Sequence, residues 1–198
     1  NQTLKILEHL LNLNRTLPED VVSAFNLIRK HFNEDAGLLA PLYLNTYTLN
    51  PGEALFLKPG VMHSYLNGAG IEIMANSDNV LRAGLTPKYK DIPEVLNTLV
   101  YKPYVQKVIL PKNIDDTYFV YSVPVKEFEL QSLHIMPGLN LKLPLHNMPV
   151  IILCYQGEVT IPEHQKILSP GKATFITSDI PELSLKGQGI LWLATVPT

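Results

Sequence analysis

The side chains best suited to chemistry in this chain of 198 residues lie between residues 63 and 88. His63 follows an alternating apolar stretch that ends at Pro59 and Gly60, so it is expected at the end of a strand. A neutral imidazole is a standard zinc ligand. A lone histidine at a strand end is more often structural. Taken alone, His63 therefore fits either a metal ligand or a structural residue.

A second group of candidates lies in the stretch SDNVLRAGLTPK, residues 77–88. The guanidinium of Arg82 has the fork geometry that binds an oxyanion or a phosphate through two hydrogen bonds. Lys88 suits phosphate attraction as a point charge. Asp78 suits either proton transfer or the orientation of Arg82. The alternative for both cations is a solvated surface position, and Lys90 is expected to be solvated.

An internal repeat helps to separate scaffold from chemistry. Residues 51–75 align without a gap on residues 170–194, at a shift of 119 positions. Identical residues include the glycines at 52 and 68, which meet Gly171 and Gly187. Both copies read as strand, turn, strand, turn, strand, and the repeat predicts two similar β-domains.

The differences between the two copies are informative. Three polar residues of the first copy meet other types in the second, as His63/Glu182, Tyr65/Ser184 and Glu72/Leu191. Because the shared positions belong to the scaffold, the three polar residues are candidates for chemistry. His63 would bind a metal, and Tyr65 and Glu72 would contact a substrate. An exposed strand face explains Glu72 equally well.

The remaining pattern predicts a mainly β protein with a short N-terminal helical segment. Helices are expected over 4–13 and 16–32, and a short one over 93–100, within a loop over 77–104. Strands are expected from Gly37 onward, including 42–49, 53–58 and 71–75. From Val105 strands dominate again, and they are expected over 118–123, 128–135, 140–145, 150–161, 172–177 and 189–196.

Composition narrows the class of partner. The net charge of −2 gives no reason to expect a nucleic acid or a membrane surface. No apolar run reaches the roughly 18 residues that a membrane span needs. The single cysteine, Cys154, cannot form an internal disulfide, which favours a reducing, cytoplasmic location. It is expected to be a buried small hydrophobe.

The spacing of four residues resembles the second motif of cupins: Gly52, Gly60, His63 and Asn67. In that motif the histidine binds the metal. Lys58 stands where the family has proline, and the closely spaced histidines of the first cupin motif do not appear upstream. Two cupin-type jelly-roll units are therefore expected, of which the first is incomplete in this chain.

The stretch MANSDNVLRAGLTPKYKDIPE, residues 74–94, resembles the signature of type I mannose-6-phosphate isomerases, which are zinc enzymes of the cupin class. The resemblance is strong over about residues 34–105. It implies the end of a helical domain over 1–36, the C-terminal half of the catalytic cupin with its active-site loop over 37–104, and a smaller cupin-like domain over 105–198.

The same resemblance implies a reaction and roles. The family interconverts mannose 6-phosphate and fructose 6-phosphate through an enediol. By this resemblance, His63 is a zinc ligand, Arg82 and Asp78 are catalytic, and three residues contact the sugar phosphate: Lys88, Tyr65 and Glu72. The family's other zinc ligands, a glutamine, a histidine and a glutamate, come from an N-terminal region missing here. Alone, the chain is therefore expected to bind zinc weakly and to turn over nothing.

Two other classes remain open. A metal-free, cupin-like sugar-binding or regulatory module would keep the fold and lack the chemistry. A cupin dioxygenase would need several histidines in one barrel, and it ranks last.

Overall fold

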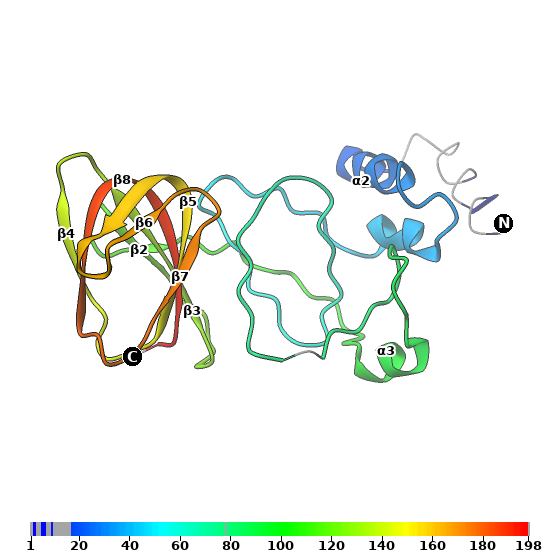
Figure 1. The fold of residues 1–198 in the computed structure, drawn as a ribbon. Helices are drawn as coiled ribbons and strands as arrows, with labels where there is room; N and C mark the ends of the chain where they lie inside the picture. Colours follow the sequence, from blue (N-terminus) through cyan, green and yellow to red (C-terminus); the bar gives the residue numbers. More distant parts are fainter. Residues whose placement is uncertain (1, 3–4, 7–8, 10–16, 78, 198) are drawn as a thin grey trace. The chain divides into compact units, whose positions relative to one another are not determined.

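The structure, a computed structural model, describes residues 2, 5, 6, 9, 17–77 and 79–197. It is mainly β, as predicted, with an antiparallel sheet of eight strands (Figure 1). The chain divides into two compact units. The first unit comprises residues 1–50, 55–71 and 77–107, and the second comprises 51–54, 72–76 and 108–198.

The second unit holds the whole sheet. Its strands are β1 (Lys112–Asn113), β2 (Tyr118–Tyr121), β3 (Glu129–Ile135), β4 (Asn140–Pro144), β5 (Val150–Ile161), β6 (Lys166–Leu168), β7 (Ala173–Ile176) and β8 (Glu182–Thr195). The long strands β5 and β8 organise it. β8 pairs with β3, β4 and β5, and β5 also pairs with β6 and β7. The strands expected between residues 118 and 196 are confirmed, whereas β1 and β6 were not predicted. The last two strands of the second repeat copy form one strand, β8.

A cluster of buried apolar side chains forms the core of this sheet. Alternate residues of β8 point inward and are no more than 1% exposed: Leu183, Leu185, Leu191 and Leu193. β5 contributes Ile152, Cys154, Val159 and Ile161, all fully buried. Burial raises the pKa of the Cys154 thiol, as expected for a buried, unreactive cysteine. Three polar residues of the sheet are buried as well: Gln131 and Ser132 of β3 and Thr174 of β7.

One predicted turn is wrong. A turn was expected around the glycines of the second repeat copy, but β8 runs unbroken through Gly187 and Gly189. Gly189 lies opposite Gly157 of β5. A Cβ at Gly157 would overlap the carbonyl of Gln188, and one at Gly187 would overlap the carbonyl of Glu158. These glycines let two paired backbones approach closely and do not form a turn.

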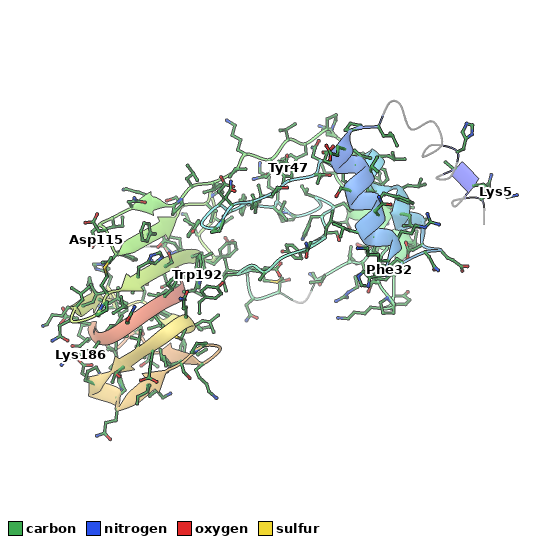
Figure 2. All side chains as sticks on the ribbon, turned by 90° about the horizontal axis from the view of Figure 1, so that it is seen from above. Lys5, Phe32, Tyr47, Asp115, Lys186 and Trp192 are labelled. Atoms are coloured by element: carbon green, nitrogen blue, oxygen red, sulfur yellow. The ribbon has the colours of Figure 1, made fainter. Side chains whose placement is uncertain are left out.

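This close approach predicts a large effect of one methyl group. Gly157→Ala is expected to lower the free energy of unfolding of the second unit by at least about 2 kcal/mol, because it adds an overlap to a left-handed backbone with φ of 80°. Gly171→Ala is the matched control, since Gly171 has the same φ of 80° but no atom within 4 Å of the added Cβ. Urea unfolding followed by fluorescence of Trp192, the only tryptophan (Figure 2), measures both. Equal effects would contradict this account.

The first unit contains the helices α2 (Glu19–Arg29) and α3 (Ile92–Thr98) and the 3-10 helix η1 (Ala36–Leu42). The helices predicted over 16–32 and 93–100 are confirmed, and the one over 4–13 falls largely outside the described residues. A small apolar cluster joins α2 to η1 through Phe25, Ile28 and Leu38, with Phe32, Leu39 and Leu85 packed against it. Among the described helices, none combines the length and apolar character that a bilayer crossing requires.

The strands predicted over 42–49, 53–58 and 71–75 are wrong. Within the described residues these stretches form no ladder, apart from an isolated bridge between Ala54 and Ile109. The backbone of the first copy nevertheless keeps turn angles of the second, with φ of 89° at Gly52 and 80° at Gly171.

The missing ladder has a physical reason. In the second copy, β7 and β8 pair with β3, β4 and β5, all of which precede the copy in sequence. The stretch that precedes the first copy instead forms α2 and η1. A strand needs a partner for its backbone N–H and C=O groups, and the described part of this chain offers the first copy almost none.

Candidate functional site

The side chain of His63 is held by a hydrogen bond that is compatible with metal binding. Its Nδ1 atom lies 3.0 Å from the carbonyl oxygen of Val61. Since a carbonyl oxygen only accepts hydrogen bonds, Nδ1 carries the proton and Nε2 of the neutral ring keeps its lone pair. A backbone carbonyl that holds Nδ1–H is the usual support of a histidine bound to metal through Nε2. The side chain is exposed, so Nε2 is accessible.

Tyr65 lies beside His63. The two ring centroids are 6.2 Å apart with planes at 76°, an edge-to-face contact. Tyr65 is 73% exposed, so most of its ring is available to a ligand. The structure thus brings together two of the three polar residues that distinguish the first repeat copy.

The third, Glu72, belongs to the 72–76 segment of the second unit and is exposed. Its counterpart in the complete copy is Leu191, which is fully buried in the sheet interior. In the second copy, where the ladder is formed, this repeat position faces inward. A carboxylate buried at such a position would need a ligand or a hydrogen-bond partner.

Arg82 and Lys88 lie on one loop of the first unit. Arg82 is partly buried, and its guanidinium makes a long hydrogen bond of 3.5 Å to the carbonyl of Val80. Lys88 is exposed, and its backbone amide donates to the Thr86 hydroxyl at 3.2 Å. Asp78, the proposed acid/base, lies outside the described residues.

The sequence did not point to Asp35, which anchors this loop. Its Oδ1 accepts from the Gly37 amide at 2.7 Å, and the carboxylate also accepts from the amide of Leu85. Its Oδ2 lies 3.4 Å from the ammonium of Lys90. The prediction that Lys90 is solvated is wrong, because its side chain is only 35% exposed and is paired with Asp35. The available signal was an aspartate at the N-cap of η1.

Burial, hydrogen bonds and the charge of Lys90 all act on the pKa of the Asp35 carboxyl. Burial raises its pKa, but hydrogen bonds from Gly37, Leu85 and Lys90, together with the charge of Lys90, outweigh burial, so the pKa lies below the ordinary 3.8. The phenol of Tyr43 also faces this charge: burial, and then the Asp35 carboxylate, raise the pKa of Tyr43.

The lowered pKa predicts an acid sensitivity with a definite sign. Folding favours the ionised carboxylate, so its stabilisation is complete above 3.8 and is lost as the pH falls through the lower folded value. We expect the helical signal of the first unit to weaken in this window. Circular dichroism at 222 nm between pH 5 and pH 2 measures it, and Asp35→Asn should remove this component. An unchanged acid profile in Asp35→Asn would contradict the assignment.

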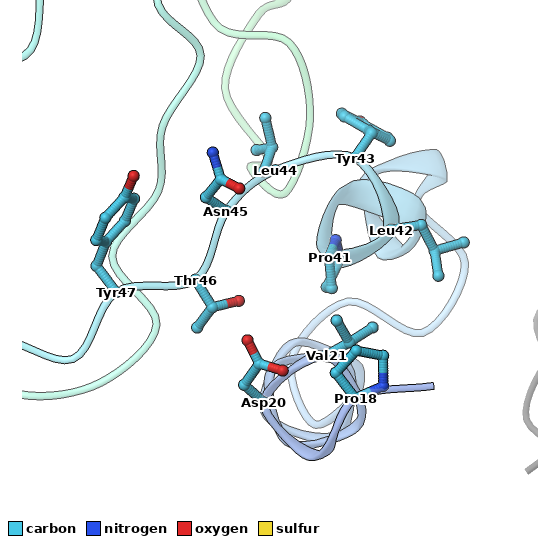
Figure 3. Close-up of a pocket in the computed structure, with 10 residues that line it drawn as sticks. All are labelled: Pro18, Asp20, Val21, Pro41, Leu42, Tyr43, Leu44, Asn45, Thr46 and Tyr47. Atoms are coloured by element: carbon cyan, nitrogen blue, oxygen red, sulfur yellow. The ribbon is translucent and has the colours of Figure 1, made fainter. Parts of the chain in front are cut away.

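A pocket of about 460 Å³ lies elsewhere in the first unit (Figure 3). It separates α2, with Asp20 and Val21, from the segment that carries Thr46. At the edge of the pocket, the Tyr47 hydroxyl accepts a hydrogen bond of 2.8 Å from the backbone amide of Gln106. None of the predicted site residues lines it.

Metal-ligating side chains are sparse. Over residues 17–77 and 79–197, no group of three His, Cys, Asp or Glu residues could hold a metal ion. A zinc site that included His63 would therefore need ligands from outside the described residues.

Comparison with known proteins places the chain in a family context. No family model matches it. Mannose-6-phosphate isomerases of Salmonella typhimurium and Escherichia coli are each 36% identical over 194 residues, 96% of this chain and 48% of theirs. The probable mannose-6-phosphate isomerase of Caenorhabditis elegans is 32% identical over 93% of this chain. The chain is a homologue of the mannose-6-phosphate isomerases.

Solved structures agree with this relation. The Salmonella typhimurium mannose 6-phosphate isomerase bound to fructose 6-phosphate and zinc matches 98% of this chain at a TM-score of 0.78 and 32% identity. That match covers 49% of the solved chain, and this isomerase homologue spans about half the length of the curated relatives it matches. The predicted family resemblance is confirmed.

Other solved structures of the Salmonella isomerase carry single alanine replacements. Three of them replace a histidine, a glutamate nine positions later and an arginine ten positions after that. This isomerase homologue has His63, Glu72 and Arg82 at the same two separations.

Proposed function

We propose that this chain is the C-terminal portion of a zinc-dependent mannose-6-phosphate isomerase, which interconverts mannose 6-phosphate and fructose 6-phosphate. One observation carries the proposal: the separations of His63, Glu72 and Arg82 equal those of the three residues replaced in the Salmonella isomerase. All three lie in the stretch where sequence and fold both match that enzyme.

His63 is the zinc ligand of this proposal. Its Nε2 lone pair is exposed and its ring is held through Nδ1, which fits a metal ligand. Catalytic zinc usually has three protein ligands, so the rest come from residues before this chain. Further variants of the Salmonella isomerase replace a histidine, a glutamate and two lysines more than a hundred positions before its matching histidine. Only 62 residues precede His63 here.

The reaction moves a proton between C1 and C2 of the open-chain sugar. Zinc, when bound, would polarise the carbonyl and hydroxyl oxygens of the sugar. Arg82 holds the developing oxyanion or the phosphate through its fork. Lys88 attracts the phosphate, and Asp78 transfers the proton or orients Arg82.

Tyr65 and Glu72 line the substrate site in this proposal. Tyr65 packs edge-on against His63, and the residue is 73% exposed. Glu72 stands where the complete copy places an inward residue, so it would reach a sugar hydroxyl or support a metal ligand.

Catalytic and structural roles are assigned to different domains in this proposal. In this proposal, residues 37–104 belong to the C-terminal half of the catalytic cupin, whose strands would form once the missing ladder partners are supplied, and residues 1–36 are the end of a helical domain. Residues 105–198 are structural in this proposal, which the large apolar core cluster of the second unit supports. A cytoplasmic location is part of the proposal and rests on the unpaired, buried Cys154.

The rival function is a metal-free sugar-binding or regulatory module, and the lack of a three-ligand group in the described residues favours it. The two are separated by comparing the chain alone with a joined protein, in which the part of the Salmonella isomerase that precedes its match is fused to Asn1. Zinc titration calorimetry and a coupled isomerase assay give the readouts.

We expect no turnover and weak zinc binding from the chain alone. The joined protein should bind one zinc and isomerise mannose 6-phosphate. Turnover or tight stoichiometric zinc in the chain alone would overturn the idea that its site is incomplete. A folded joined protein that binds fructose 6-phosphate without zinc or turnover would favour the binding module.

A further inference from the structure

Asp35 binds the loop that carries Arg82 and Lys88, although the two are separated by about fifty residues in the sequence. The Asp35 side chain is 18% exposed and gathers three donors, two of which come from that loop. The Gly37 amide binds Oδ1 at 2.7 Å, and the loop supplies the amide of Leu85 and the ammonium of Lys90. A part-buried carboxylate with several donors is a strong and directional anchor.

The backbone at the anchor point is strained. Leu85 adopts φ of 54°, the left-handed region that residues with a Cβ rarely occupy. Its amide is held by Asp35, and its side chain packs against the Phe25, Ile28 and Leu38 cluster. A conformation that costs of order 1–3 kcal/mol persists only when the surroundings enforce it.

The backbone around Gly37 and the backbone around Gly84 pack so closely that neither position has space for a side chain. A Cβ on Gly84 would lie 2.9 Å from Oδ1 of Asp35 and 3.5 Å from Cα of Gly37. A Cβ on Gly37 would lie 2.7 Å from Cγ of Leu85. Glycine at both positions lets the loop backbone approach the carboxylate closely enough for the Leu85 amide to reach it.

We propose that Asp35 is a positioning residue that holds the loop of residues 82–90 in place and so aims Arg82 and Lys88. Within the described residues, the hydrogen bond of the Arg82 guanidinium is a long one of 3.5 Å to the carbonyl of Val80, and Lys88 is exposed. Leu85 lies three residues after Arg82 and three before Lys88, so anchoring Leu85 fixes the backbone from which both cations extend. A displacement of about 1 Å at such groups can cost about a hundredfold in rate.

The task of Arg82 and Lys88 rests on the proposed function, but the anchoring does not, so the test needs no turnover. The native chain is digested with trypsin, and cleavage after Arg82 and Lys88 is timed. We expect Asp35→Ala to speed both cuts at least about tenfold, because local opening is easier. Asp35→Asn keeps one amide acceptor and should give an intermediate rate. Lys90→Met removes the 3.4 Å ion pair with Asp35 and the 3.5 Å contact with the Thr86 carbonyl, both of them long, and should change the rates little.

Asp115→Ala is the matched control. Asp115 of the second unit also accepts an amide two residues on, that of Thr117, at 2.7 Å from Oδ1. Its loss should leave cleavage after Arg82 and Lys88 unchanged. Equal acceleration by Asp115→Ala, or no acceleration by Asp35→Ala, would overturn the proposal.

A spectroscopic readout separates anchoring from general support. The amide proton resonances of Gly37 and Leu85 should titrate together with the Asp35 carboxyl and should not titrate in Asp35→Asn. If Asp35→Ala fails to fold, the Asn variant and this titration still decide the matter. Amides that titrate independently, or that titrate in Asp35→Asn, would overturn the proposal. Absent turnover in the joined protein would count against the proposed function alone.

Discussion

His63→Ala in the joined protein is expected to abolish zinc binding and to lower kcat by at least about a thousandfold, or about 4 kcal/mol of barrier. His63 is the single histidine between residues 37 and 104, and its Nδ1–H donates a hydrogen bond to the Val61 carbonyl. Removing one of few protein ligands leaves zinc without its coordination geometry. Zinc content by atomic absorption and coupled turnover of fructose 6-phosphate measure the effect.

His31→Ala serves as the control, because His31 is an exposed histidine of the first unit just after α2. It should keep both zinc and turnover. Full zinc occupancy in the His63 variant would remove His63 from the ligand set. Loss of zinc with unchanged turnover would show that the metal is not used in the reaction.

Leu191→Glu is expected to unfold the second unit at room temperature. Leu191 is fully buried on the inward face of β8, with Leu183, Leu185 and Leu193 on the same face. An unpaired carboxylate there costs several kcal/mol, at least about 4, which is a large part of the stability of a small domain. This substitution is informative because Leu191 aligns with Glu72 in the repeat. Leu191→Glu therefore gives the second copy the glutamate that the first copy has.

Phe175→Glu is the matched control, since Phe175 lies in β7 of the same sheet and its side chain is 60% exposed. It should change the free energy of unfolding by less than about 0.5 kcal/mol. Urea unfolding monitored by Trp192 compares the two. A stable, cooperative Leu191→Glu variant would mean that the interior admits charge, and the contrast between scaffold and site positions would fail.

Much of the second unit was predictable because its signals are local. Alternating apolar residues identified β5, and its ends match the prediction at Val150 and Ile161. α2 was also predictable, since acids at Glu19 and Asp20 and a basic Arg29 mark its two ends. These features depend only on side chains a few positions apart.

The candidate site was predictable in residue type and not in geometry. The repeat singled out His63, Tyr65 and Glu72, and the structure places His63 and Tyr65 in ring contact. The carbonyl of Val61 that sets the His63 tautomer was not predicted, because a backbone conformation decides it.

The sequence by itself determined the family, the repeat and the types of residue at the site, since these reside in the order of side chains. Tertiary structure alone decided three other matters. The 42–75 stretch has strand patterning but no ladder, because pairing depends on distant partners. Gly157 and Gly189 face each other across β5 and β8 and leave no room for a side chain. Asp35 meets Leu85 and Lys90 only when the chain folds back, because hydrogen bonds and ion pairs form by distance in space.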